Sequence, residues 1–139
     1  MKIIDLFCGI GGLSLGFEQA GFEVVSAIDM WSDAIKTYNH NRTDKVAKVE
    51  TVEQFNEEDL PKLVKEHHIT GIIGGPPCQG FSTVGKREID DPRNQMYLEF
   101  YKAVKTAMPD FSLSLYAFAI SSAPVPWKHP TDHILFDRV

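Results

Sequence analysis

A glycine-rich turn directly after a short apolar run constrains the fold of this chain more than any other feature. Residues 2–7, KIIDLF, predict a β-strand, and Gly9, Gly11 and Gly12 follow it at once. A helical pattern of apolar residues then begins at Leu13. A strand, a tight turn and a helix in this order form the first unit of a parallel α/β sheet, whose turn lies at the carboxyl edge of the strand.

The same alternation continues along the chain. Further strands are expected at residues 22–28, 46–49 and 69–73, with a fifth beginning at residue 111. Helical patterns are expected around residues 34–38, 57–65 and 97–108. Strands that alternate with helices give parallel βαβ units with both faces of the sheet covered. The predicted fold class is therefore α/β, a Rossmann-like doubly wound sheet.

Composition limits the class of protein. The chain has 139 residues, of which 43% are apolar and 24% charged, as expected for one folded domain rather than a disordered or fibrous segment. Its longest apolar-leaning run, residues 113–120, is too short for a bilayer span, so no membrane association is expected. The two cysteines are too few for a disulfide scaffold or a metal cage, which favours a cytoplasmic location and no metal site.

The net charge of −5, from 14 basic and 19 acidic residues, argues against a chain that holds nucleic acid by bulk charge. The distribution is uneven, because residues 84–105 hold five basic and four acidic side chains. A local basic face therefore stays open as an expectation.

The glycine turn and an acidic residue predict a nucleotide-like ligand. Asp29 follows the second strand, where a carboxylate can accept the hydroxyl groups of a ribose. Ser14 stands where the dinucleotide-binding pattern has its third glycine, so the match is partial. These residues alone leave three alternatives open: a nicotinamide cofactor, S-adenosylmethionine, or a plain tight turn with Asp29 capping the helix that begins near Ser32.

A second loop carries a candidate nucleophile. The segment GGPPCQGFS, residues 74–82, follows the fourth strand and should lie at the same sheet edge as the glycine turn. Two prolines stiffen the backbone before Cys78, which presents a thiol in an open cleft. Cys8, at the end of the first strand, is instead expected to be a small buried packing residue.

Together the two segments resemble a known family. DLFCGIGGLSLGFEQAGF at residues 5–22 and GGPPCQGFS at residues 74–82 are similar to motifs I and IV of the DNA (cytosine-5) methyltransferases, and the resemblance continues through RNQMYLEFYKAV at residues 93–104. It implies an S-adenosylmethionine-dependent methyltransferase fold that transfers a methyl group to carbon 5 of cytosine in DNA. It implies a methyltransferase domain at residues 1–111, partial and truncated after about five strands, and a divergent tail at residues 112–139.

The resemblance also implies roles for single residues. Cys78 would be the catalytic nucleophile, and Gln79 and Ser82 would lie near the substrate DNA. The cofactor pocket would be formed by Phe7, Gly9, Gly11, Gly12, Leu13, Asp29, Met30, Glu50, Pro77 and Leu98. Asp29 would hold the ribose, Met30 would pack on the adenine, and Glu50 would lie near the adenine amino group.

The chain departs from the family after residue 111. Leu115 and Tyr116 fall where the family has the Glu and Asn of its Glu-Asn-Val motif, and that Glu is the acid that assists addition to the base. This departure leaves two functions open. The first is a cytosine-5 methyltransferase of which this chain is an incomplete form. The alternative is a non-catalytic S-adenosylmethionine-binding remnant, or one half of a split enzyme whose later motifs come from a second polypeptide. His129 and His133 have the spacing of a metal pair, but Pro130 between them makes this signal weak.

Two other enzyme classes fit less well. A nicotinamide oxidoreductase explains neither the Pro-Pro-Cys loop nor its place after the fourth strand. An amino-methyltransferase shares the fold, but its chemistry calls for Asp or Asn before the proline pair, and Cys78 argues against it. The expected partner is double-stranded DNA, bound through the complete enzyme.

Overall fold

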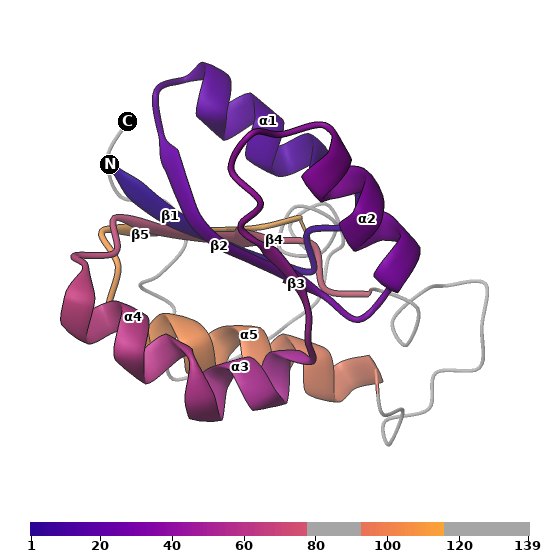
Figure 1. Cartoon of the computed structure of the whole chain (residues 1–139). Coiled ribbons are helices and arrows are strands. Elements are labelled where there is room, and N and C mark those ends of the chain that lie inside the picture. The colour runs from indigo at the N-terminus through magenta and orange to yellow at the C-terminus, as the bar shows by residue number, and fades with distance from the viewer. Residues whose placement is uncertain (78–92, 116–139) are drawn as a thin grey trace, which may run out of the picture.

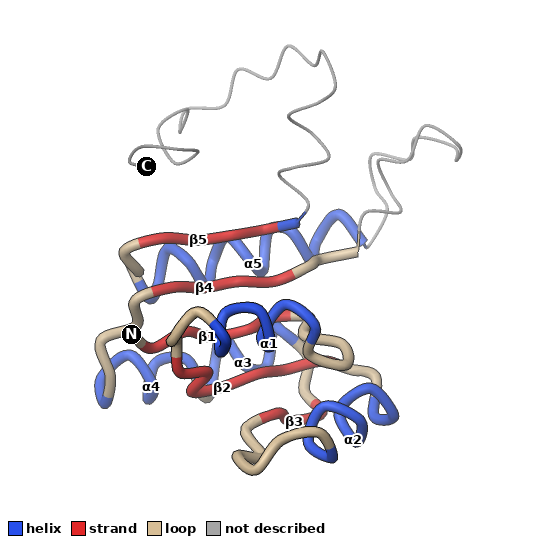
Figure 2. Tube along the Cα trace, turned by 90° about the horizontal axis from the view of Figure 1, so that it is seen from above, coloured by secondary structure: helices blue, strands red, loops and turns tan. Residues whose placement is uncertain are grey.

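The computed structural model describes residues 1–77 and 93–115, which form a five-stranded parallel sheet between two layers of helices (Figure 1). The strands are β1 (Lys2–Leu6), β2 (Glu23–Asp29), β3 (Ala47–Val49), β4 (Gly71–Gly74) and β5 (Phe111–Ser114). Their order across the sheet is β3-β2-β1-β4-β5, which Figure 2 shows from above. The predicted doubly wound α/β fold is confirmed.

Helices cover both faces of the sheet. On one face lie α1 (Gly12–Gln19) and α2 (Ser32–His40), and on the other lie α3 (Val52–Glu58), α4 (Leu60–Glu66) and α5 (Arg93–Ala107) (Figure 1). Among the described residues, no helix is long and apolar enough to cross a membrane.

Alternation along β1 separates two apolar cores. Ile4 and Leu6 join the core under α3, α4 and α5, whereas Ile3 joins the core under α1 and α2. Successive side chains of a strand point to opposite faces, so Asp5 must face the α1 layer with Ile3. A carboxyl group is therefore enclosed on the same side of the sheet as the glycine turn.

The helix predicted at residues 57–65 was wrong in its bounds. Helical structure begins earlier, at Val52, where the Thr51 side chain accepts a hydrogen bond from the N–H of Gln54 and caps α3. This first helix, α3, ends before Asp59, and a new helix, α4, begins after it. Pro61 suits the first turn of α4, because it lacks an N–H. The result is two short helices rather than one.

The topology brings the two sequence motifs to one edge. β1 pairs with β2 on one side and with β4 on the other, and all of these strands run parallel. The turn after β1 and the segment after β4 therefore leave the sheet side by side at its carboxyl edge. In open α/β sheets ligands bind at this point, where the strand order reverses.

Candidate functional site at the carboxyl edge of the sheet

The loop between β1 and α1 contains three residues with left-handed backbone. These are Phe7, with φ 59°, Gly9, with φ 53°, and Gly11, with φ 88°. A Cβ added to Gly9 would meet no atom of the described residues, so this glycine faces open space. A Cβ on Gly11 would lie 2.6 Å from the Tyr38 ring and from an Arg42 nitrogen. The two glycines thus have different surroundings: Gly9 borders the open edge, whereas Gly11 packs against Tyr38 of α2 and against Arg42, two residues beyond the end of α2.

Asp29 ties the end of β2 to this loop. One carboxylate oxygen accepts the backbone N–H of Gly9 at 2.9 Å, and the other accepts the N–H of Trp31 at 2.9 Å. A capping residue would instead bond the first turn of the following helix, and α2 has no side-chain cap. Asp29 therefore braces the glycine loop and keeps lone pairs on both oxygens for a further donor.

A buried polar chain lies beneath the loop. The Ser14 hydroxyl donates to Asp5 at 2.5 Å and in turn accepts the Tyr38 hydroxyl at 2.9 Å. All three side chains are buried, and among the described residues the second Asp5 oxygen has no hydrogen-bond partner. Burial raises the pKa of Asp5 to about 7, although hydrogen bonds from Ser14 lower it, and burial raises the pKa of Tyr38 to about 12.

Sequence reasoning did not assign a role to Asp5, Tyr38 or Arg42. The one available signal was an acidic residue in the middle of the apolar run KIIDLF, which is unusual for a strand covered on both faces. Ser14 was noted only as a departure from the glycine pattern. The structure explains this departure, because the Ser14 hydroxyl links β1 to α2.

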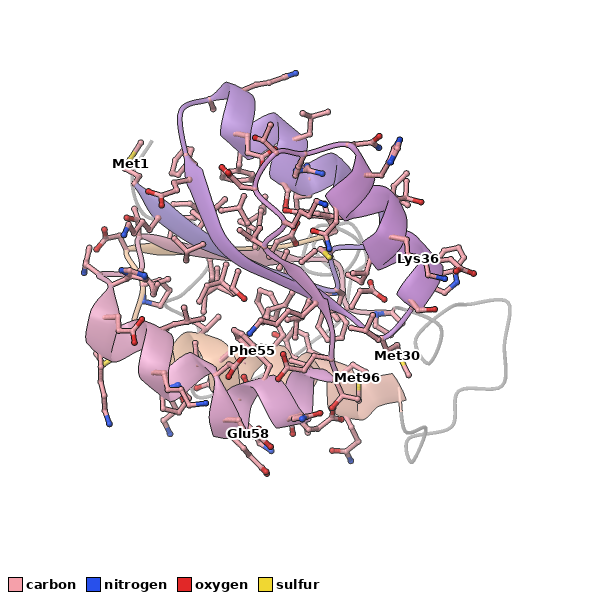
Figure 3. All side chains as sticks on the ribbon, viewed as in Figure 1. Met1, Met30, Lys36, Phe55, Glu58 and Met96 are labelled. Carbon is pink, nitrogen blue, oxygen red and sulfur yellow. The ribbon has the colours of Figure 1, made fainter. Side chains whose placement is uncertain are left out.

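Two further cofactor candidates, Glu50 and Met30, directly follow strands that end at the same edge, and a third, Leu98, lies on α5. Glu50 follows β3, and its N–H donates to the Asp29 carbonyl at 3.1 Å. Burial, followed by the charge of Asp59, raises the pKa of the Glu50 carboxyl. Met30 follows β2 with 74% of its surface exposed, on the outside of the fold (Figure 3), and Leu98 on α5 is 48% exposed.

Several large apolar side chains are exposed where the strands end. Ile10 in the glycine loop, Met30 and Trp31 after β2, and Val49 at the end of β3 are all more than half exposed. Exposed apolar groups that gather around a few polar groups are typical of a binding surface. Pro77 is also exposed, at the end of the described segment that follows β4.

Several sequence-based candidates lie outside the part of the chain that the structure describes. Cys78, Gln79 and Ser82 lie outside the described residues, as do Tyr116, His129 and His133. The residues that are described contain no cluster of three or more potential metal ligands. Cys8 is buried, and burial raises the pKa of its thiol, which confirms it as a packing residue rather than a nucleophile.

A polar pocket of 320 Å³ lies elsewhere, between α3 and α5. Its lining includes Glu53, Asn56, Glu99 and Lys102. The Asn56 amide donates to the carbonyl and to the carboxylate of Glu99, both at 3.0 Å. Among the described residues, none of the sequence-predicted site residues lines this pocket.

Comparison with known proteins agrees with the motifs. The family described as C-5 cytosine-specific DNA methylase matches residues 1–113. The Type II methyltransferase M.HgiGI of Herpetosiphon aurantiacus is 45% identical over 109 residues, which cover 78% of this chain and 84% of that protein. The Type II methyltransferase M.AgeI of Thalassovita gelatinovora is 43% identical over 115 residues, again 78% of this chain but only 26% of M.AgeI.

Solved structures share the fold. A protein encoded within an E. coli prophage, whose proposed role is DNA modification methyltransferase, superposes with a TM-score of 0.70 and 43% identity over 82% of this chain and 31% of its own. The S. pombe Dnmt2 methyltransferase has a TM-score of 0.63 at 24% identity, over 86% of this chain and 38% of its own. The chain therefore spans about a quarter to two fifths of several of the proteins that it matches. The family match over residues 1–113 and the shared fold show that this chain belongs to the C-5 cytosine-specific DNA methylase family.

Proposed function

We propose that this chain provides the cofactor and nucleophile part of an enzyme that transfers a methyl group from S-adenosylmethionine to carbon 5 of cytosine in DNA. The observation that carries the proposal is the pairing of β1 with both β2 and β4. It brings the glycine loop, Asp29 and the Pro76–Pro77 segment to one carboxyl edge, where a cofactor and a reacting base would meet. Family membership supports the same reaction.

The residues at this edge fit S-adenosylmethionine. Asp29 keeps lone pairs for the hydroxyl groups of a ribose, and Met30 offers an exposed apolar side chain for an adenine. The first turn of α1 begins at Gly12, and the N–H groups of a helix N-terminus suit the carboxylate of the amino-acid end. We assign Glu50, Pro77 and Leu98 to the same cofactor surface, since Glu50 directly follows β3 and Pro77 lies in the segment after β4. When bound, the cofactor supplies an electrophilic methyl group.

Cys78 is the proposed nucleophile, and it is one residue beyond the described Pro76–Pro77 segment. Its thiolate adds to carbon 6 of a cytosine that has been flipped out of the duplex, which makes carbon 5 nucleophilic. After carbon 5 is methylated, loss of its proton and departure of the thiolate restore the aromatic ring. Gln79 and Ser82 would contact the DNA strand beside the flipped base.

The proposed reaction needs groups that this sequence does not supply at the expected positions. Leu115, directly after β5, stands where the family has a Glu that assists addition at the ring nitrogen. A second polypeptide with the later motifs would supply this acid and much of the DNA-binding surface. Such an enzyme would act in the cytoplasm, at the nucleoid in a bacterium.

The test uses DNA that contains 5-fluorocytosine, which traps the covalent adduct because fluorine cannot leave as a proton does. The chain is incubated with this DNA and S-adenosylmethionine, with and without a polypeptide that carries the later motifs. We expect an adduct only in the presence of that polypeptide, and none with Cys78→Ala. An adduct that survives Cys78→Ala would contradict the nucleophile assignment.

Cofactor binding is tested separately by isothermal titration with millimolar S-adenosylmethionine. We expect weak binding that Asp29→Ala abolishes. Binding of the cofactor without an adduct under any condition would favour the non-catalytic remnant. Tighter binding of NAD than of S-adenosylmethionine would contradict the cofactor proposal.

A further inference from the structure

Arg42 follows α2 and returns to the glycine loop, where it makes three kinds of contact. One terminal nitrogen donates to the Gly11 carbonyl at 2.8 Å. Its Nε donates to both carboxylate oxygens of Glu18 on α1, at 3.0 and 3.1 Å. Its guanidinium lies 3.9 Å from the centre of the Tyr38 ring, a cation–π contact. A single side chain thus joins α1, α2 and the loop.

Arg42 contacts Gly11, which is the residue directly before α1 and its N-cap. The Gly11 carbonyl also accepts the N–H of Leu15 at 3.0 Å, the first helical bond of α1. The space beside Gly11 is filled by Tyr38 and Arg42, since a Cβ there would lie 2.6 Å from each. Arg42 therefore limits both the position of the loop and the direction of the α1 N-terminus.

Arginine is the side chain that this geometry requires. Only 11% of the Arg42 side chain is exposed, and 30% of that of Glu18. A planar guanidinium can donate to a carboxylate and to a carbonyl while stacking on a ring, whereas the compact ammonium of Lys cannot make all three contacts at once.

We infer that Arg42 is a positioning residue, which holds Gly11 and the α1 N-terminus in the arrangement that receives the amino-acid end of S-adenosylmethionine. This inference rests on the cofactor proposed above. Arg42 contacts the glycine loop from the side of α1 and α2, and it would act on the cofactor only through the position of this loop. Asp29 braces the same loop from the β2 side through Gly9.

Hydrogen exchange of the full chain without ligand tests the positioning role directly. The contacts of Arg42 with Gly11, Glu18 and Tyr38 are called the Arg42 clamp. We expect Arg42→Lys to speed exchange of the Gly11 and Leu15 amides by about tenfold or more, because loss of the Arg42 clamp favours local opening of the loop. The Phe55 amide, on the opposite face of the sheet (Figure 3), should be unchanged. Lys36→Met is the control variant, since Lys36 is exposed and forms an ion pair with Asp33, which is also exposed, on the outer face of α2.

Ligand titration tests the consequence for binding. S-adenosylhomocysteine carries the amino-acid end, and 5′-methylthioadenosine lacks it but keeps the adenosine. We expect Arg42→Lys to weaken binding of the first about tenfold and of the second less than about twofold, because preorganisation is lost at one end only. A general loosening of the fold would weaken both equally.

The outcomes separate the two proposals. Unchanged exchange at Gly11 and Leu15, or equal weakening of both ligands, would overturn the role of Arg42. A wild-type chain that binds neither ligand, while Arg42→Lys still speeds exchange of the loop, would overturn the cofactor proposal and leave the clamp supported. If Arg42→Lys does not fold, Glu18→Gln weakens one contact of the same clamp and should shift both measurements in the same direction.

Discussion

Gly11 and Gly16 lie five residues apart in the chain, and their surroundings differ. Gly11 has a left-handed backbone with φ 88° and lies against Tyr38 and Arg42. Gly16 is exposed in the middle of α1, where an added Cβ would meet no atom of the described residues. The first position needs glycine for two independent reasons, and the second needs it for none.

We expect Gly11→Ala to lower the free energy of unfolding by about 2 kcal/mol or more, from backbone strain and overpacking together. The matched variant Gly16→Ala should raise it by about 0.5–1 kcal/mol, since alanine restricts the unfolded chain and favours the helix. Urea denaturation measures both. Equal effects at the two positions would contradict the packing described around Gly11.

Asp5 makes the stability of the fold depend on pH. Burial, the largest cause, raises its pKa from 3.8 to about 7, so the folded chain keeps a proton that the unfolded chain releases between these values. The free energy of unfolding should therefore fall as the pH rises through this window, by up to about 4 kcal/mol in total.

Asp5→Asn removes this titration while keeping a side-chain oxygen as an acceptor for Ser14. Relative to wild type, the variant should gain up to about 3 kcal/mol in unfolding free energy between pH 5 and pH 8. Urea denaturation at the two pH values measures the gain. A difference between variant and wild type that does not change with pH would show that Asp5 is ionised throughout.

At the scale of elements, β1, β5 and α5 approach β4 so closely that the first and last residues of β4 must be glycine. A Cβ on Gly74 would lie 2.2 Å from the Leu6 carbonyl oxygen of β1 and 3.2 Å from the Phe100 ring of α5. A Cβ on Gly71 would lie 2.3 Å from the Phe111 ring of β5. The small residues at both ends of β4 therefore let the strands and α5 pack at this distance.

We expect Gly74→Ala to lower the free energy of unfolding by about 3 kcal/mol or more, because the backbone of β1 cannot yield without loss of strand pairing. Gly75→Ala is the matched control, since its Cβ would make an ordinary contact of 3.5 Å with Leu115. Thermal unfolding followed by circular dichroism measures both. Similar melting temperatures for the two variants would contradict the close approach at Gly74.

At the scale of the whole molecule, the net charge limits how tightly the chain alone can bind DNA. Its net charge is −5, so long-range attraction to a polyanion is absent even though the family acts on DNA. We expect the chain to bind duplex DNA no more tightly than a dissociation constant of about 10⁻⁴ M at physiological salt. Fluorescence anisotropy with a labelled duplex measures this, and micromolar affinity would locate a DNA-binding surface within this chain.

Local patterns were enough to predict the order of strands and helices, the doubly wound class and the edge at which the glycine loop and Asp29 meet. Each depends on periodicity, on glycine and proline, or on the rule that parallel strands place their carboxyl ends together. The same patterns misplaced the helix at residues 57–65, because the capping by Thr51 and the break before Pro61 compete with apolar periodicity.

Only the tertiary structure decided which side chains support the loop. Ser14 and Tyr38 are 24 residues apart, and Arg42 and Gly11 are 31 apart, yet each pair is joined by a hydrogen bond. A local pattern carries no information about such pairs, because they form when α2 packs on α1 over the sheet. The sequence by itself determined at which edge of the sheet the glycine loop lies, and the packing of α1 and α2 decided how this loop is held.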